Sequence, residues 1–429
     1  MFKKLVLFFL LFTLVYRPEF IFIPHSVNMF FGILGMLVYF SNRKRANVIT
    51  ASAGLSIGYI IRCFIPLVLV SFVSILVNFS FDLYYPRLAF SIVLSFFSYY
   101  LVAVMFYKIY GKMTIQKLSD YFIIAECLFL FIGLVSFFSP EVFNMLNSIQ
   151  RLGEIGEDAI ERTSGTRLIS IGATFFTAAI INGFVLIIIG LHFLYDKLSV
   201  KKRIVYLISF LYIFAVGLMM GRTTLIGGAL GVLLIAFSVV KGKVSFFKFF
   251  FSCAVTVGIS IFIISKVMSN SKYDFTVLSE FGFEMFINYL NGEGFDANSN
   301  NVLRDMYNTK PTDIKTWIIG DAKWSEGDHY YKNVDSGYLR GLWYFGIIGL
   351  LTLFIYYYRI IRYCVVRQKK FFGKTVIPLL TFMGYVVILN YKGPADLYFY
   401  LLPYMYCTMC SDKKLITESI TTVHKYSEQ

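Results

Sequence analysis

Apolar runs of about 20 residues recur from one end of the chain to the other, with short polar stretches between them. A helix of that length crosses about 30 Å of hydrocarbon, so each run predicts a membrane span. About twelve spans are expected on this basis. They lie near residues 5–23, 27–41, 53–78, 88–107, 120–138, 168–191, 204–220, 225–240, 249–267, 337–358, 375–391 and 396–410. The pattern therefore predicts an all-α polytopic membrane protein.

The composition fits this fold class. The 429 residues are 58% hydrophobic and only 15% charged, whereas a soluble domain has about 25% charged residues. The net charge of +15 raises the question of a nucleic-acid partner. Its basic residues, however, sit in short clusters between apolar runs, which is typical of cytoplasmic loops, so no nucleic acid is expected.

The distribution of lysine and arginine predicts the orientation. With both termini on one side, that side carries 24 of the 40 basic residues and the other side carries 15, while Arg62 falls within a span. The side with the excess is the cytoplasm by the positive-inside rule. Both termini are therefore expected to be cytoplasmic.

Two long connections then lie on the outer face, at 139–167 and 268–336. They divide the chain into N-terminal spans (1–138), central spans (168–267), and C-terminal spans with a short cytoplasmic tail (337–429). A loop of about 70 residues over a membrane is usually functional. We expect it to be helical in pieces.

Arginines on the predicted outer face are the main chemical signal. They include Arg167, Arg222, Arg304 and Arg340. The positive-inside rule disfavours arginine there, and the planar guanidinium binds two phosphate oxygens at once. Arg222 lies between two apolar runs with almost no loop around it. It is interpreted either as an anion ligand or as a turn residue that extends to the interface.

Polar residues precede the tenth span in the stretch GDHYYKNVDSGYLRG. His329 has acidic neighbours that could orient it or raise its pKa, and a solvated loop histidine is the simpler alternative. Asp335 has an alternative role as a helix N-cap. Within the spans, Glu126 and Asn182 are functional candidates because polar groups in lipid are costly. No metal or nucleotide motif is present, so neither a metal site nor a cofactor is expected.

Three stretches, in this order, resemble the bacterial O-antigen polymerase (Wzy-type) and O-antigen ligase superfamily. TRLISIGATFFTAAIINGF resembles an arginine that enters a mid-chain span, and GRTTLIGGALGVLL resembles an SR turn followed by an apolar helix. GDHYYKNVDSGYLRGLWYFGIIG resembles the end of the large outer loop. Gly221 replaces the serine of the SR turn. Tyr330 follows His329 where the ligase branch has Asn or Ser, which favours the polymerase.

The resemblance implies a GT-C-like helical bundle in the bacterial inner membrane. It implies a metal-independent glycosyltransferase that joins undecaprenyl-pyrophosphate-linked repeat units on the periplasmic face. Arg167, Arg222, Arg304 and Arg340 would then bind pyrophosphate. Of the implied catalytic residues His329, Asp335 and Arg222, the first two would accept or orient the acceptor proton. The aromatic residues Trp324, Tyr330 and Tyr338 would stack on sugars, or form an interfacial aromatic belt.

Two other functions stay open. An O-antigen ligase would transfer the chain to lipid A-core and would share this topology. A flippase for the lipid-linked unit should show internal symmetry, polar residues at midplane depth and short loops on both sides. The chain has no visible repeat and one dominant outer loop, so the flippase is ranked last. A chain-length regulator and membrane lipid are the further partners considered.

Overall fold

The computed structural model describes residues 1–23, 25–151, 160, 163, 165–173, 175–242, 275–292, 298–327 and 329–408. In these ranges the chain is helical apart from its connections and one two-stranded hairpin, β1 (Ser325–Glu326) and β2 (His329–Tyr330). The protein is therefore an all-α, membrane-embedded chain by length and composition of its helices.

Six helices among the described residues are long and apolar enough to cross a membrane. They are α4 (Ile57–Asn78), α5 (Tyr84–Tyr110), α6 (Ile115–Phe138), α9 (Phe175–Tyr195), α10 (Val200–Met220) and α16 (Gly337–Arg367). Shorter apolar helices are α2 (Val27–Ser41), α11 (Thr224–Val240) and α18 (Val376–Lys392). The expected span at 249–267 lies outside the described residues. The count of twelve stays a prediction.

The chain folds into two compact units. The first unit comprises Met1–Arg17, Ile23–Leu118 and Asn301–Gln429, and the second comprises Pro18–Phe22 and Ser119–Asn300. The first unit thus joins segments from both ends of the chain, whereas the division expected from the sequence was linear.

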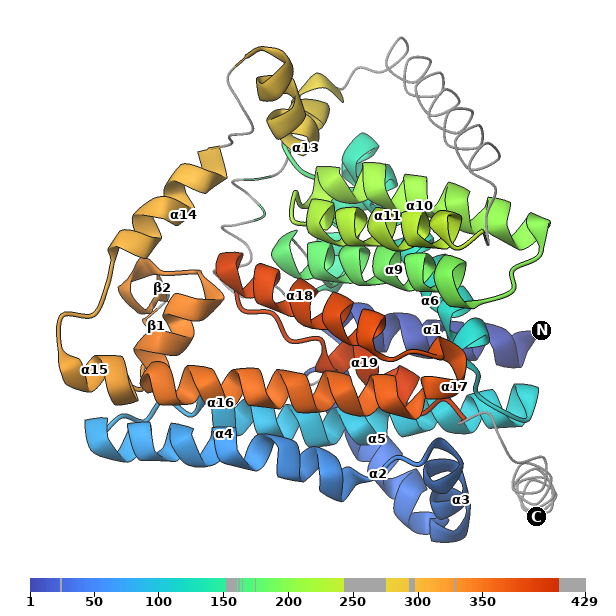
Figure 1. The fold of residues 1–429 in the computed structure, drawn as a ribbon, viewed down its shortest axis with the longest axis horizontal. Helices are drawn as coiled ribbons and strands as arrows, with labels where there is room; N and C mark the ends of the chain where they lie inside the picture. The colour runs from blue at the N-terminus through green and yellow to red at the C-terminus, as the bar shows by residue number, and fades with distance from the viewer. Residues whose placement is uncertain are drawn as a thin grey trace. The chain divides into compact units, whose positions relative to one another are not determined.

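Long helices lie side by side in the first unit, where α4 packs against both α5 and α16 (Figure 1). Helix α2 packs along α5, next to α1 (Phe2–Tyr16) and α3 (Arg43–Ala53). The contact is close because a Cβ at Gly35 would lie 2.0 Å from the carbonyl oxygen of Phe97. Buried Asn28 accepts hydrogen bonds from Ser95 and Ser98 at 3.1 and 3.2 Å. Small residues and polar side chains commonly hold membrane helices together in this way.

Helix α16 is broken near its start. Gly346 has φ 67° and ψ −167°, a conformation that essentially only glycine adopts. A Cβ there would lie 2.2 Å from the carbonyl oxygen of Ile318, so α15 (Ile314–Ile319) packs directly against the break. The short helical segment before the break, Gly337–Phe345, is therefore separate from the long apolar part of α16 that follows.

The end of the expected large outer loop is ordered by its own small core. Val334, Leu339, Leu342 and Trp343 are buried together. Side chains from preceding segments pack on this core: Met306 and Tyr307 of α14 (Asn298–Asn308), Trp317 of α15, and Tyr331 of the 3₁₀ turn Tyr331–Asn333. The expectation that the loop is helical in pieces is met by α13 (Phe275–Leu290), α14 and α15.

Connections that the charge pattern assigns to one side of the membrane lie together in the first unit. Asp82, between α4 and α5, accepts a hydrogen bond from the Trp324 backbone N–H at 2.6 Å. Tyr307 donates to the carbonyl oxygen of Tyr391 at 2.9 Å, near the end of α18. Three expected outer connections therefore meet at one end of this unit.

The opposite end of the first unit gathers expected cytoplasmic segments. Arg367 donates to the carbonyl oxygen of Ala53 at 3.4 Å. Gln368, just before α17 (Lys369–Phe372), donates to the carbonyl oxygens of Tyr404 and Cys407, both at 3.2 Å. The helices thus alternate in direction as their loops predict.

The last expected span, 396–410, is shorter than predicted. Helix α18 ends at Lys392 and α19 covers only Tyr398–Met405, with an irregular segment at 393–397 between them. Asn390 holds this segment, since its amide accepts from the Ala395 N–H at 3.3 Å and donates to the Ala395 carbonyl at 3.0 Å. The irregular backbone is satisfied by protein rather than by a longer helix.

Helix α9 forms the centre of the second unit and packs against α10 and α11 (Figure 1). Nearly all its apolar length is buried inside the protein. A Cβ at Gly227 of α11 would lie 2.1 Å from the Cα of Gly183 of α9. Glycine at that position lets the two backbones touch, as in other membrane helix pairs.

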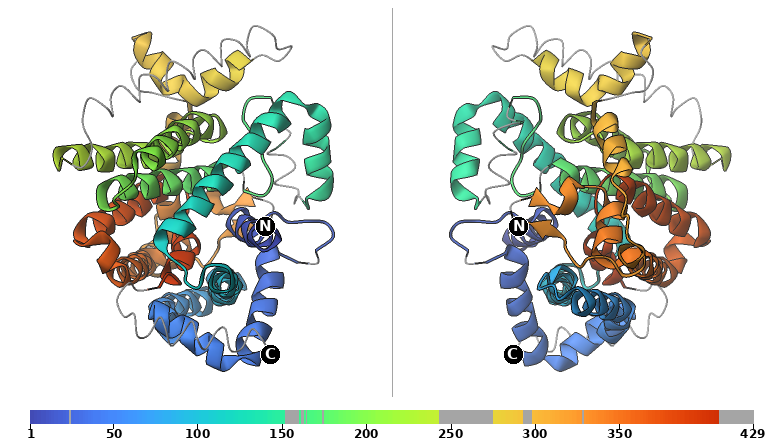
Figure 2. Two further views of the ribbon diagram at one scale, coloured as in Figure 1. Left: turned by 90° about the vertical axis from the view of Figure 1, so that its right-hand side faces the viewer. Right: turned by 90° about the vertical axis from the view of Figure 1, so that its left-hand side faces the viewer.

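Helix α7 (Pro140–Ile149) turns back from the end of α6 after Ser139 (Figure 2). The end of α7 pairs with residues 18–22, which belong to the same unit. Ile21 donates its N–H to the Ile149 carbonyl at 3.1 Å, and Arg151 donates its N–H to the Glu19 carbonyl at 2.6 Å. The expected span at 5–23 was therefore wrong at its end, because α1 ends at Tyr16 and residues 19–21 pair with the connection that follows α7.

The predicted span at 168–191 was wrong at its start, because α9 begins at Phe175. Residues 168–173 are irregular, and Leu168, Ile169 and Ser170 are buried. Ser170 donates to the carbonyl oxygen of Phe129 at 2.7 Å, and the Gly172 N–H donates to Gln150 at 2.7 Å. Partners on other segments thus replace helical hydrogen bonds, which apolar periodicity alone cannot reveal.

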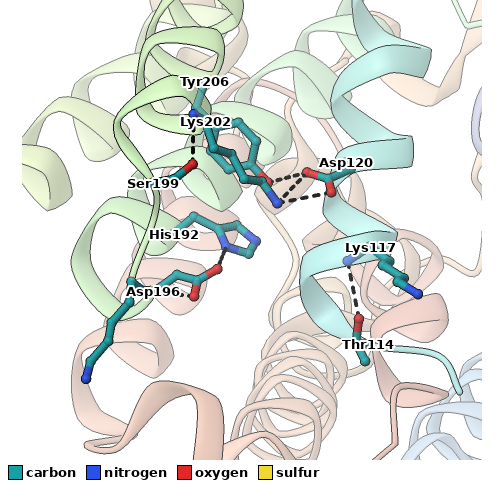
Figure 3. A network of polar contacts seen from close by, with 9 residues as sticks. Thr114, Lys117, Asp120, His192, Asp196, Ser199, Lys202 and Tyr206 are labelled. Atoms are coloured by element: carbon teal, nitrogen blue, oxygen red, sulfur yellow. Dashed lines mark hydrogen bonds and ion pairs between the residues drawn. The ribbon is translucent and has the colours of Figure 1, made fainter.

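A polar network closes the other end of the second unit (Figure 3). Lys202 contacts Asp120 at 2.9 Å, and Tyr206 donates to the same carboxylate at 2.6 Å. His192 Nδ1 lies 3.3 Å from Asp196 one turn later. Asp120 thus ties α6 to α10, and the His192–Asp196 contact lies at the end of α9.

Candidate functional site

Two of the expected phosphate-binding arginines meet in the second unit. The guanidinium of Arg167 lies 4.3 Å from the ring centre of Phe281, and that of Arg222 lies 4.6 Å from the same ring. Arg222 also forms an ion pair with Glu284, one turn along α13 from Phe281. The side chain of Arg222 is 11% exposed, so the group is recessed but reachable.

Local backbone features bring these arginines together. The Leu168 N–H donates to the Met219 carbonyl at 3.2 Å, which places the segment after Arg167 beside the end of α10. Arg222 follows in the turn to α11. A Cβ at Gly221 would lie 2.9 Å from both the Ala179 Cβ and the Phe175 carbonyl oxygen. A side chain at position 221 would therefore crowd α9.

The electrostatics of this group favour an anion. Burial, and then the nearby charge of Arg222, lower the pKa of the Arg167 guanidinium. Two cations therefore share one aromatic ring, and Glu284 offsets the charge of one of them. Groups of this kind suit a ligand that carries more than one negative charge.

Arg340 is enclosed by aromatic rings in the first unit. Its guanidinium lies 3.8 Å from the ring centre of Trp324 and 3.9 Å from that of Tyr330. Trp324 stacks in turn on Tyr84 at 3.7 Å. Arg340 also donates to the Trp324 carbonyl at 3.3 Å and lies 3.8 Å from the carboxylate of Asp335. With a side chain only 5% exposed, Arg340 binds the hairpin to α16.

Asp335 lies beside this stack with its side chain half exposed. Partial burial raises the pKa of its carboxyl, against the lowering effects of Arg340 and Lys392. The proposed capping role is not seen, because the N-cap of α16 is Ser336 and no side chain bonds the first turn. A carboxyl with a raised pKa beside an arginine is suited to proton transfer.

His329 is exposed on β2 and pairs across the hairpin with Glu326. The carboxylate of Glu326 lies 3.9 Å from Lys323 rather than against the imidazole. Asp328, the nearest acidic neighbour in sequence, lies outside the described residues. His329 therefore lies at the surface of the first unit. The next residue, Tyr330, contacts Arg340.

The three expected sugar-stacking residues differ in exposure. Trp324 is 9% exposed and contacts rings or a guanidinium on its faces, while Tyr330 is 41% exposed. Tyr338 donates its hydroxyl to the Val387 carbonyl of α18. Of these three, Tyr330 offers the most surface to a ligand. Arg304, the remaining expected pyrophosphate ligand, is exposed on α14.

Glu126 and Asn182, singled out because they lie within apolar runs, also meet. Both are fully buried in the second unit, together with Thr224. With the amide oriented by its surroundings, the Asn182 nitrogen donates to Glu126 and to the Ala178 carbonyl, and its oxygen accepts from Thr224 at 3.2 Å. This polar cluster joins α6, α9 and α11, which is sufficient to explain it as packing between membrane helices.

The expected residues thus fall into two groups. Arg167 and Arg222 belong to the second unit, and the first unit holds His329, Asp335, Arg340, Arg304 and the three aromatic residues. The sequence reading missed Phe281 and Glu284, which lie three residues apart in a stretch interpreted as loop. Their spacing places them on one helix face, which was the available signal. No family model, curated protein or solved structure matches the chain.

Proposed function

We propose that the protein is a polymerase that joins undecaprenyl-pyrophosphate-linked oligosaccharide units into a surface polysaccharide. The observation that carries this proposal is the placement of Arg167 and Arg222 around Phe281. Each arginine was singled out from a different stretch of sequence as a pyrophosphate ligand. Two guanidinium groups in one recessed site suit the several negative charges of a lipid pyrophosphate.

In the proposed reaction, an acceptor hydroxyl oxygen bonds to the anomeric carbon of the donor chain. The bond from that carbon to the pyrophosphate oxygen breaks, and its electron pair leaves with the lipid pyrophosphate. Arg167 and Arg222 stabilise the charge that develops there, so the step proceeds by electrostatic stabilisation. The acceptor hydroxyl gives its proton to a general base as the new bond forms.

Glu284 would compete with pyrophosphate for Arg222. It already pairs with Arg222, so a pyrophosphate oxygen must compete with its carboxylate. Pyrophosphate carries several negative charges, whereas the Glu284 carboxylate carries one. A ligand that carries two charges and contacts both arginines therefore has the advantage.

A surface-glycan gel from a strain that lacks the gene tests the proposal. Core lipopolysaccharide with a single repeat unit supports the polymerase, because one unit is still exported and attached. Bare core with long chains on the lipid carrier would show a ligase instead. Bare core with single units retained inside the cell would show a flippase.

A further inference from the structure

The irregular segment 393–397 begins at the end of the first unit where Tyr307 meets Tyr391, and it leads inward to α19. Tyr398, the first residue of α19, donates its hydroxyl to the Ile92 carbonyl at 3.0 Å. Ile92 is about 12 Å along α5 from Tyr84, at 1.5 Å of rise per residue. Irregular backbone at such depth in a membrane protein is found where it is covered by protein or lines a polar cavity.

Asp396 places a carboxylate on this segment. One of its oxygens accepts from the Tyr356 hydroxyl at 3.0 Å, and the other accepts from the Tyr398 N–H at 2.8 Å. Tyr356 is 1% exposed, yet Asp396 keeps part of its own surface accessible. A carboxylate enclosed by membrane helices is costly and usually has a functional reason.

Arg17 brings a cation to the same place. Its guanidinium lies 3.8 Å from the ring centre of Phe399, which follows Asp396 by three residues. Its Nη2 atom is buried and has no hydrogen-bond partner among the described residues. Arg17 is the C-cap of α1, with φ 50° and its N–H bonded to the Thr13 carbonyl, so the end of α1 fixes its position.

A carboxylate and a guanidinium in one place limit the kinds of ligand that could bind there. A phosphate would meet the negative charge of Asp396, and a metal ion would meet the positive charge of Arg17. A neutral ligand with neighbouring hydroxyl groups satisfies both, because a hydroxyl donates to carboxylate and accepts from guanidinium. The partly exposed ring of Phe399 adds an apolar face. A sugar ring has all these features.

We propose that Arg17 and Asp396 form a saccharide-binding site in the first unit, with Phe399 as the apolar contact. The proposed site does not include the hairpin residues His329 and Tyr330. The identification of its ligand as the acceptor repeat unit rests on the proposed function. The inference that a neutral saccharide binds here is independent of the proposed function.

The test is calorimetric titration of the purified full chain with repeat-unit oligosaccharide, released from its lipid pyrophosphate by mild acid. Asp396→Asn keeps an oxygen that can accept from the Tyr398 N–H, so the start of α19 should persist. Loss of a hydrogen bond to a charged group should weaken binding about tenfold. Arg17→Gln should have a similar effect from a different helix. Asp313→Asn, at an exposed residue that precedes α15, is the matched control and should bind as the wild type does.

Equal affinity of the wild type and of a folded Asp396→Asn or Arg17→Gln variant overturns the inference, and so does a wild type that binds no oligosaccharide. Thermal unfolding of each variant checks that it is folded. If the variants lose binding while the wild type makes no polymer, the site stands and the polymerase proposal fails. If the wild type makes polymer and the variants bind normally, the polymerase proposal stands and the site fails.

Discussion

Arg222 and Arg340 differ in what surrounds their charge. Arg340 is held between two aromatic rings and is 5% exposed, which suits a role in holding the hairpin on α16. Arg222 has one ring, one carboxylate and a reachable surface. Buried cation–π contacts are worth about 2 kcal/mol, so Arg340 contributes chiefly to stability. At the residue scale, Arg222 is therefore the stronger candidate for ligand binding.

Arg222→Ala should abolish long glycan chains. Removal of one group that stabilises developing charge typically lowers a rate by about 100-fold or more. The measurement is the length distribution of surface glycan on a gel, with protein abundance in the membrane checked by immunoblot. Arg203→Ala, at the opposite end of α10, should leave the distribution unchanged. Normal chain lengths in Arg222→Ala would remove Arg222 from the reaction.

Asp335→Asn should stabilise the folded protein at neutral pH. Burial raises the pKa of Asp335 above its ordinary value of 3.8, so the folded state binds its proton more tightly than the unfolded state does. Its contribution to stability is then fully present below pH 3.8 and is lost as the pH rises through the folded-state pKa. Asparagine cannot ionise and avoids this loss.

Thermal unfolding of both proteins as a function of pH checks this effect. The midpoint of Asp335→Asn should exceed that of the wild type at pH 7, and the difference should shrink below pH 4. A wild-type midpoint that is higher at pH 7 would mean that the contact with Arg340 outweighs the burial of the carboxyl.

At the element scale, the break in α16 sets the position of the large loop. Gly346→Ala should destabilise the protein by about 1–3 kcal/mol, because alanine is strained at this φ and ψ. Its Cβ would also meet the Ile318 carbonyl. Gly384→Ala in α18 is the control, since a Cβ there meets no atom within 4 Å. Thermal unfolding in detergent should separate the two variants, and equal midpoints would mean that the break is not required.

Helix α13 covers the arginine pair through Phe281 and Glu284. Glu284→Gln removes the competing charge and should tighten the binding of inorganic pyrophosphate about fivefold. Glu280→Gln, one turn earlier and exposed, should have no effect. Titration of the purified protein measures both. Unchanged or weaker binding in Glu284→Gln would show that the carboxylate does not compete with the anion.

At the scale of the whole molecule, apolar periodicity predicted most helices well. The expected span at 27–41 coincides with α2, and the expected span at 225–240 differs from α11 by one residue. These helices follow directly from uninterrupted apolar runs. The loops that charge assigns to one side also meet at one end of the first unit.

The parts that sequence could not predict depend on contacts between distant segments. Residues 168–173 are as apolar as a helix, yet they are irregular because Phe129 and Gln150 supply their hydrogen bonds. The segment 393–397 is likewise held by Asn390. The sequence indicated the arginines of the site because arginine is unusual on the predicted outer face. It did not indicate Phe281 and Glu284, because nothing near Arg222 in the sequence shows which segment covers it.

The most direct test of the polymerase is reconstitution. The purified full chain is placed in lipid vesicles with undecaprenyl-pyrophosphate-linked repeat units and no other protein. A ladder of longer lipid-linked chains is expected, with one undecaprenyl pyrophosphate released for each bond formed, and no ladder with Arg222→Ala. Repeat units that stay single with the wild-type protein, while the pyrophosphate carrier remains fully loaded, would contradict the polymerase proposal.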